Sequence, residues 1–221
     1  MITNIGTTYL VELRPSRMVT PRPKTGRVRH VRLLLGSVFA IALLPLLAET
    51  AAAQDALPQR IEKARAAAVD FGAQLLAEVQ KSMAADGPVS TIAVCSRIAP
   101  EIAAEKSAAA HMSIGRTSLK LRQPGNAPDA WELQQLQNFE ARKAAGENPA
   151  SIEVGEFTEK DGKPVFRYMK AIPTAHPCLS CHGTQLAPEV VEKLHALYPE
   201  DRATGFAAGD LRGAFTITAP R

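Results

Sequence analysis

Aromatic side chains are scarce in this chain, which has one tryptophan and only 5% Phe, Trp and Tyr among its 221 residues. The core therefore contains few large rings, and any apolar molecule bound inside it would supply a sizeable share of the apolar contacts. The chain also lacks internal repeats, an obvious linker, and low-complexity stretches after residue 54. Residues 54–221 are therefore expected to form one domain with its own core.

Most of the chain has no excess of positive charge, although the whole sequence has a net charge of +4. Residues 1–53 hold 7 of the 26 Lys and Arg residues and 2 of the 22 Asp and Glu residues. That leaves 19 basic and 20 acidic residues in 54–221, and the basic ones do not cluster into a patch. Nucleic acid is therefore excluded as an expected partner.

The basic residues gather instead in an N-terminal leader. Several of them precede Leu33–Leu47, an apolar run of 15 residues, and Ala51-Ala52-Ala53 follows it. This order of basic, apolar and small residues is typical of a secretory signal peptide and predicts cleavage near Ala53. We expect a leader over residues 1–53 and a mature periplasmic domain over residues 54–221.

A membrane anchor is the alternative reading of the apolar run. The run is short for a membrane-spanning helix and contains Gly36 and Pro45, so cleavage is favoured over anchoring. No stable membrane insertion is expected after cleavage.

Cys178-Leu179-Ser180-Cys181-His182 is a C-x-x-C-H motif, the pattern at which a c-type haem is attached. Two thiols at this spacing reach the two vinyl groups on one porphyrin edge and form thioethers. The adjacent histidine is then held beneath the iron as an axial ligand. The motif predicts one covalent haem c, with Cys178 and Cys181 as attachment residues and His182 as a metal ligand. Covalent attachment follows export, so the leader supports this interpretation.

A redox dithiol, a zinc site and chance are the other interpretations of the motif. A redox C-x-x-C is followed by a helix that runs on, whereas Gly183 follows here and Pro173 and Pro177 precede the motif. The motif is therefore predicted to lie in a loop. Zinc requires a further ligand at short spacing, and only His176 is near.

The spacing of apolar residues predicts helices in the first half of residues 54–221 and strands in the second. Helices are expected over 57–85, ending at Asp86-Gly87, over 89–109 with a break at Pro100, over 128–145 and over 188–197. Strands are expected over 111–121, 152–159, 164–172 and 211–218, the middle two joined at Asp161-Gly162. Helices followed by antiparallel strands indicate the α+β class with a long N-terminal helix.

Several segments form distinctive motifs: Val94-Cys95-Ser96, Ala99-Pro100, residues 114–122, residues 126–132, the C-x-x-C-H-G segment, Gly205-Phe206, Gly209-Asp210 and Arg212-Gly213-Ala214. Together these segments resemble the Tll-type c-haem proteins, a family catalogued as a domain of unknown function. The resemblance covers nearly all of residues 57–219, and Gln123 departs from the asparagine expected there. It implies a PAS-like fold, an antiparallel sheet flanked by helices, with haem iron held by histidine and cysteine.

Cys95 stands where the family has its distal cysteine, so the resemblance implies that Cys95 is the second metal ligand. The residues alone leave this open, because Cys95 is a thiol left over in an oxidising compartment and a buried cysteine often acts as a small apolar residue. The other conceivable sixth ligands are Met112, Met169, His111 and His195.

Three basic residues near the middle of the chain are candidates for binding the haem propionates. Arg116 and Lys120 lie in the predicted strand and Arg122 follows it, and partly buried propionates need cationic or amide donors. A solvated strand face is the competing interpretation.

An electron-transfer haem protein with a redox partner protein is the function that these features favour. The alternative is a redox or gas sensor of NO or CO that acts through a partner, suggested by the PAS-like fold. An enzyme is not expected, because no distal His/Arg pair suited to peroxide cleavage is evident.

Overall fold

The computed structural model describes the backbone of residues 44–221 and the side chains from residue 57 onward. The first 43 residues of the predicted leader lie outside the described residues, so the signal peptide and its cleavage near Ala53 remain predictions. Within the part that the structure describes, no helix combines the length and apolar character that a membrane crossing needs.

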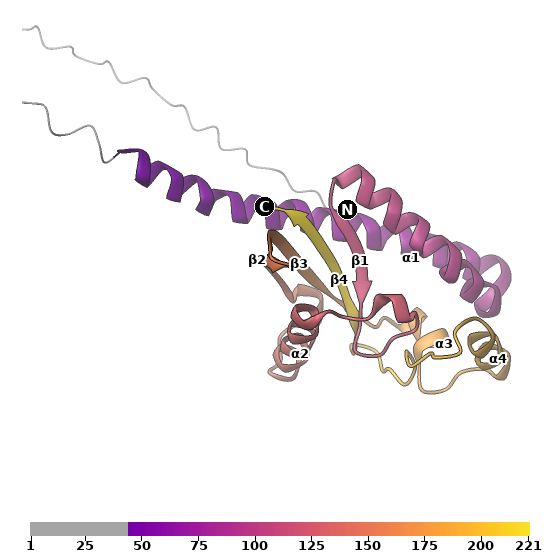
Figure 1. The fold of residues 1–221 in the computed structure, drawn as a ribbon. Helices are drawn as coiled ribbons and strands as arrows, with labels where there is room; N and C mark the ends of the chain where they lie inside the picture. Colours follow the sequence, from indigo (N-terminus) through magenta and orange to yellow (C-terminus); the bar gives the residue numbers. More distant parts are fainter. Residues whose placement is uncertain (1–43) are drawn as a thin grey trace, which may run out of the picture. The chain divides into compact units, whose positions relative to one another are not determined.

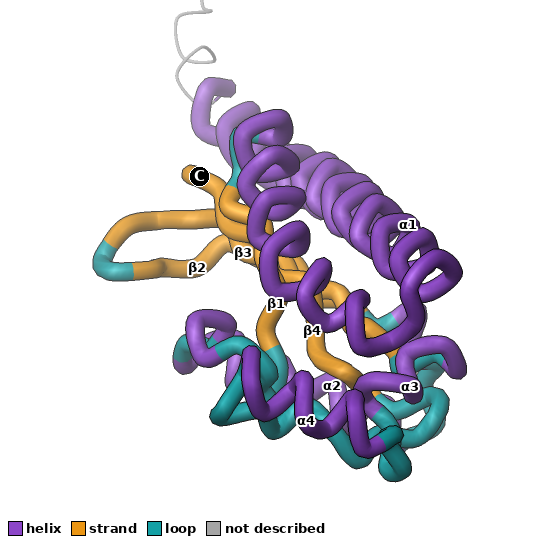
Figure 2. The backbone as a smooth tube through the Cα atoms, turned by 90° about the vertical axis from the view of Figure 1, so that its right-hand side faces the viewer, coloured by secondary structure: helices purple, strands orange, loops and turns teal. Residues whose placement is uncertain are grey.

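The first element, α1 (Leu44–Ala110), is a helical hairpin rather than one straight helix. It reverses at Gly87, whose φ of 73° is open to glycine and strained for other residues. The two halves run back alongside each other (Figure 2), as the 2.7 Å ion pair of Lys106 with Asp70 also requires. The predicted helix over 57–85 lies within the first half of α1, which begins earlier, at Leu44, and its predicted end at Asp86-Gly87 is confirmed.

The predicted break of the second helix at Pro100 is wrong, because the helix continues through it to Ala110. Pro100 is exposed, while Ala99 and Ile102 on either side are 3% and 4% exposed in the core. Pro100 removes one backbone hydrogen bond on the side of the helix that faces solvent. The free energy gained by burying the residues on either side of Pro100 outweighs this loss.

Four antiparallel strands form a single sheet in the order β1-β4-β3-β2 (Figure 1). They are β1 (Ser113–Thr117), β2 (Glu153–Lys160), β3 (Lys163–Pro173) and β4 (Leu211–Pro220). The predicted β2–β3 hairpin is confirmed, with Lys160 paired to Lys163 across Asp161 and Gly162, both of positive φ.

The two faces of the sheet are covered by different helices. Phe166, Tyr168 and Ile217 point to the α1 side, where they pack with apolar residues of both halves of the hairpin. Met169 and Ala171 point the other way and pack with α2 (Ala130–Ala144), within the helix predicted over 128–145. This is the expected alternation of a strand buried on both sides.

The C-x-x-C-H motif is helical, which corrects the predicted loop. A 3-10 turn (His176–Cys178) leads directly into α3 (Leu179–His182). Pro177 occupies the first turn, where its missing N–H is not needed, and Gly183 ends the helix. The proline and glycine that suggested a loop therefore start and stop a short helix.

The last helix, α4 (Pro188–Leu197), holds the motif region against the α1 hairpin. Its range matches the prediction. Val190 and Leu194 are 1% and 3% exposed and pack with Ile92 of α1, and Cys181 joins the same cluster. The motif thus lies beside the second half of α1, near the end of the sheet (Figure 1). Together these elements confirm an α+β, PAS-like fold.

Candidate functional site

The two motif cysteines and His182 are placed by one short helical segment. Cys178 ends the 3-10 turn, and Cys181 and His182 belong to α3. Residues three apart in a helix lie on the same side, so the thiols of Cys178 and Cys181 can both react with one bound molecule. All three cysteines of the chain lie in the described residues, carry free thiols and are half-buried.

His182 is oriented by a hydrogen bond to backbone. Its Nδ1 lies 2.7 Å from the carbonyl oxygen of Ala203. A carbonyl only accepts, so Nδ1 carries the proton and donates it, and Nε2 is the nitrogen with the lone pair that a metal would take. In this structure Nε of Arg212 approaches that nitrogen at 3.5 Å. Burial, with the positive charges of Arg212 and Arg122, lowers the pKa of His182 well below its usual value. The imidazole is therefore neutral, as a ligand must be.

Arg212 of β4 lies beside the imidazole ring. Its Nε is 3.2 Å from Nδ1 and 3.5 Å from Nε2 of His182, and its Nη1 donates to the hydroxyl of Ser118 at 3.2 Å. Burial and repulsion from Arg122 and Arg116 lower its pKa to about 10. Within residues 57–221 no carboxylate forms an ion pair with Arg212. The site therefore holds positive charge that an anionic group would balance.

Cys95 is brought to the same site by the second half of α1. It lies one turn beyond Ile92, which packs against the α4 cluster that includes Cys181. Burial raises the pKa of Cys95, while the positive charges of Arg116 and Arg122 oppose that rise. Cys95 also acts electrostatically on Cys181. A thiol far away in sequence is thus close to the motif, as the family resemblance implies.

The three predicted propionate partners occupy different depths of the site. Arg116 lies over the ring of Phe71 at 5.8 Å, and burial lowers its pKa. Lys120 is exposed at the rim, with Nζ 4.9 Å above the ring of Phe206. Arg122 is paired with Asp201, its Nη2 lying 3.0 Å from Oδ2. Arg116 and Arg122, but not Lys120, act on both Cys95 and His182.

The other conceivable sixth ligands lie in less suitable places. Met169 is fully buried in the α2-side core, on the face of the sheet opposite to α1. Met112 packs against the α1-side core, and His111 is exposed at the end of α1. His195 is exposed on α4 and lines a pocket.

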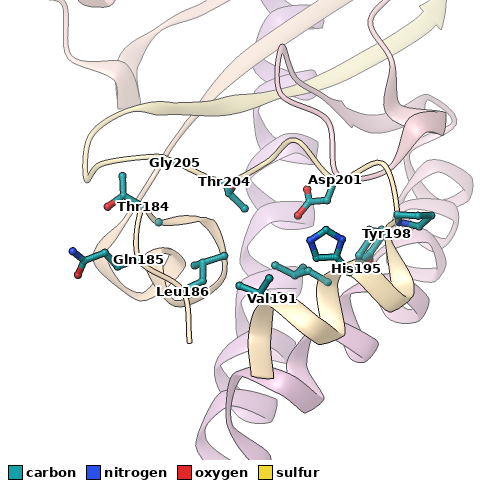
Figure 3. A pocket seen from close by; sticks show the side chains of 12 residues that line it. Thr184, Gln185, Leu186, Val191, His195, Tyr198, Asp201, Thr204 and Gly205 are labelled. Carbon is teal, nitrogen blue, oxygen red and sulfur yellow. The ribbon is translucent and has the colours of Figure 1, made fainter. Parts of the chain in front are cut away.

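A pocket of about 720 Å³ opens immediately after the motif, between residues 183–186 and the end of α4. Figure 3 shows Thr184, Gln185 and Leu186 on one side and His195, Tyr198 and Asp201 on the other. Tyr198 and Asp201 both contact Arg122, so this pocket adjoins the site on the Arg122 side. Among residues 57–221, no three His, Cys, Asp or Glu side chains converge as the zinc alternative requires.

Sequence reasoning singled out the cysteines and His182, which the fold brings into one region. It did not single out Arg212, which lies beside His182, or Asp201, which pairs with Arg122. Arg212 lies in a segment that carries the family resemblance, which is the one signal that could have drawn attention to it. Asp201 lies in a turn with no motif around it. Both become recognisable only when the fold places them against His182 and Arg122.

The chain matches the family described as Tll0287-like over residues 46–220. Among solved structures it is similar to the cyanobacterial haem-protein Tll0287, with 26% sequence identity and a TM-score of 0.57. That similarity covers 74% of this chain and 96% of the other. No curated protein matches the chain.

Proposed function

The chain belongs to the Tll0287-like family, and from this premise we propose that it is an exported c-type haem protein that transfers electrons. One haem c would be bound covalently. The similar cyanobacterial structure is of a haem-protein, which supports haem as the cofactor of this chain. The order of basic, apolar and small residues in the leader over residues 1–53 supports a periplasmic location.

The hydrogen bond from Nδ1 of His182 to Ala203 is the observation that carries this proposal. It leaves Nε2 unprotonated on a histidine that shares one short helical segment with two free thiols. This is the donor set that covalent haem attachment needs, a neutral imidazole with its tautomer fixed by the backbone and two cysteines at the required spacing. The residues present therefore fit the cofactor.

Each residue of the site has a role in holding the cofactor. Cys178 and Cys181 would form the thioethers, and His182 and Cys95 would bind the iron. The cations of Arg116, Lys120 and Arg122 were expected at the propionates, and Arg212 joins these candidates because its charge has no carboxylate partner within residues 57–221. When bound, haem supplies a one-electron couple. A separate redox partner protein would exchange electrons with it, and no enzymatic turnover is proposed.

A redox or gas sensor is the second candidate, and the PAS-like fold is the observation that favours it. In that case Cys95 would be a ligand that is released, and the second half of α1, which carries it, would pass the change to a partner protein. Electron transfer is preferred because covalent attachment keeps the cofactor through repeated redox cycles.

Covalent attachment can be tested on protein exported to the periplasm together with the haem-attachment machinery. Intact mass after acid–acetone extraction should equal residues 54–221 plus one haem, and the alkaline pyridine haemochrome spectrum should give one haem per chain. The Cys178→Ala/Cys181→Ala double variant should lose all haem to acetone. Haem that acetone extracts from the unaltered protein would contradict the proposal.

Cys95→Ala is the matched control for this experiment, since it also removes a thiol from the site. It should retain covalent haem in full, because Cys95 lies outside the motif. A mass that still includes the residues before Gln54 would mean that the signal peptide is not cleaved and serves as an anchor. Haem attachment would then be judged from the haem content alone.

A further inference from the structure

Arg122 and Asp201 form a buried ion pair directly behind the motif. Nε and Nη2 of Arg122 lie 3.2 and 3.0 Å from Oδ2 of Asp201, and the two side chains are only 12% and 8% exposed. Arg122 follows β1 and Asp201 follows α4, so the fold brings them together. A buried pair adds little net stability compared with apolar residues of similar size. The groups that the pair contacts indicate its role.

The contacts of the pair converge on the backbone around His182. Nη2 of Arg122 donates to the carbonyl oxygen of Cys181 at 2.6 Å and to that of Ala203 at 3.3 Å. Oδ1 of Asp201 accepts the N–H of Ala203 at 2.8 Å, which fixes the turn. The same Ala203 carbonyl accepts the proton of His182 Nδ1. One ion pair therefore positions both the second motif cysteine and the acceptor that orients the histidine.

We propose that Arg122 and Asp201 are positioning residues that tune His182 as an iron ligand through the carbonyl of Ala203, an inference that rests on the proposed haem function. Arg122 and His182 share that carbonyl, and an oxygen that serves two donors binds each less strongly. Arg122 thus limits how much electron density the carbonyl passes to the imidazole. Asp201 balances the charge of Arg122 and holds Ala203 in place.

Two substitutions should shift the haem midpoint potential in opposite directions. Asp201→Asn keeps the size of the side chain and removes its charge, so the buried Arg122 cation is no longer balanced and disfavours Fe(III). The Fe(II)/Fe(III) ratio at a given applied potential should rise roughly tenfold, a shift of about 59 mV upward for one electron. Arg122→Lys keeps the charge but loses the fork that reaches two acceptors. Ala203 then binds His182 more strongly, and the potential should fall.

Asp210→Asn provides the matched control. Asp210 also forms an ion pair, with Lys143 at 2.7 Å, and also accepts a backbone N–H, from Ala207 at 2.8 Å. Its side chain has no hydrogen bond to Cys181, His182 or Ala203 within residues 57–221. The same loss of one negative charge at this position should leave the potential nearly unchanged.

Redox titration of the haem-loaded proteins tests the proposal, together with proton NMR of the His182 Nδ1–H in the reduced low-spin state. Opposite shifts of the midpoint potential in the two variants, with the Nδ1–H resonance upfield in Asp201→Asn and downfield in Arg122→Lys, support the proposal. Equal potentials in all four proteins, or an equal shift in Asp210→Asn, would overturn it. If Asp201→Asn fails to fold or take up haem, an unchanged potential in Arg122→Lys overturns it alone. Unaltered protein without covalent haem would overturn the proposed function as well.

Discussion

Cys95 is the single residue whose replacement separates the possible iron ligands. Burial raises the pKa of its half-buried thiol, and the positive charges of Arg116 and Arg122 oppose that rise, so they favour the thiolate form that an iron ligand takes. A thiolate ligand stabilises Fe(III) over Fe(II), so we expect a low potential in the unaltered protein. Cys95→Ala should raise the midpoint potential and change the ferric visible spectrum, both measured by spectroelectrochemistry.

Met112→Leu serves as the comparison for the Cys95 variant, because Met112 is a rival ligand candidate that packs against the α1-side core. It should leave both the spectrum and the potential unchanged. A Cys95→Ala protein that keeps the native low-spin ferric spectrum would assign the ligand to a methionine or histidine instead.

At the residue scale, the part of the site that spacing encodes could be predicted from sequence. Cys178, Cys181 and His182 form one contiguous motif with one chemistry. Arg212 and Asp201 could not be found in this way, because their roles depend on contacts with residues 30 and 79 positions away in the chain. The family resemblance supplied Cys95, which spacing leaves undecided.

At the scale of elements, the start of α2 couples a helix cap to a buried ion pair. Asp129 caps the helix by accepting the N–H of Glu132 at 2.9 Å, and the Asp129 N–H donates to Oε2 of Glu132 at 3.0 Å. Asp129 and Glu132 both pair with Arg167, whose side chain is 2% exposed and lies 4.3 Å from the ring of Trp131. The cap therefore also fastens α2 to β3.

Asp129→Ala should lower the free energy of unfolding by about 1–2 kcal/mol through loss of the cap. Removing one of the two carboxylates of the buried Arg167 adds to this cost. Urea unfolding followed by circular dichroism measures the change. Asp70→Ala removes the exposed partner of the ion pair with Lys106 and should cost much less. Equal losses in the two variants would contradict the coupling of cap and ion pair.

The same carboxylate gives the stability of the fold a predictable acid dependence. Burial alone would raise the pKa of Asp129, but hydrogen bonds from Arg167 and from the Glu132 amide lower it to about 2 from 3.8. A group with a lowered folded-state pKa stabilises the fold above its unfolded value and loses that contribution as pH falls. The unaltered protein should therefore lose stability between about pH 4 and pH 2 more steeply than Asp129→Ala, as heat unfolding at several pH values would measure.

Helix and strand boundaries followed the sequence wherever a local signal was decisive. Gly87 and the Asp161-Gly162 turn need positive φ, and the chain reverses at both. The predictions drawn from Pro100 and Pro177 were wrong for the same reason. The effect of a proline on a helix depends on whether the N–H that it lacks would have had a hydrogen-bond partner there. Pro100 faces solvent on a helix held by buried neighbours, and Pro177 occupies a first turn.

For the whole molecule, the α+β class could be predicted from the order of its elements, but the sheet order could not. Strand β1 pairs with β4, from opposite ends of the sheet-forming sequence, and β4 also pairs with β3. Such pairing depends on long-range packing that apolar spacing does not encode. The same long-range packing places Cys95, from the first half of the chain, beside the motif in the second half.

The mobility of Cys95 decides between electron carrier and sensor. An electron carrier keeps the same ligands in both oxidation states, because moving a ligand adds reorganisation energy to each transfer. Cys95 lies on a helix whose neighbouring turns are anchored by Ile92 on one side and by Ala99 and Ile102 on the other, each at most 4% exposed. So firm a backbone favours retention of the ligand.

We therefore expect the dithionite-reduced protein to bind CO slowly or not at all, as followed by its visible spectrum after mixing. Cys95→Ala is the matched control, since it lacks the proposed ligand and should bind CO readily under the same conditions. If the unaltered protein binds CO as fast and as completely as this variant, Cys95 leaves the iron on reduction. The preference would then pass from electron transfer to a redox or gas sensor, with the second half of α1 as the element that responds.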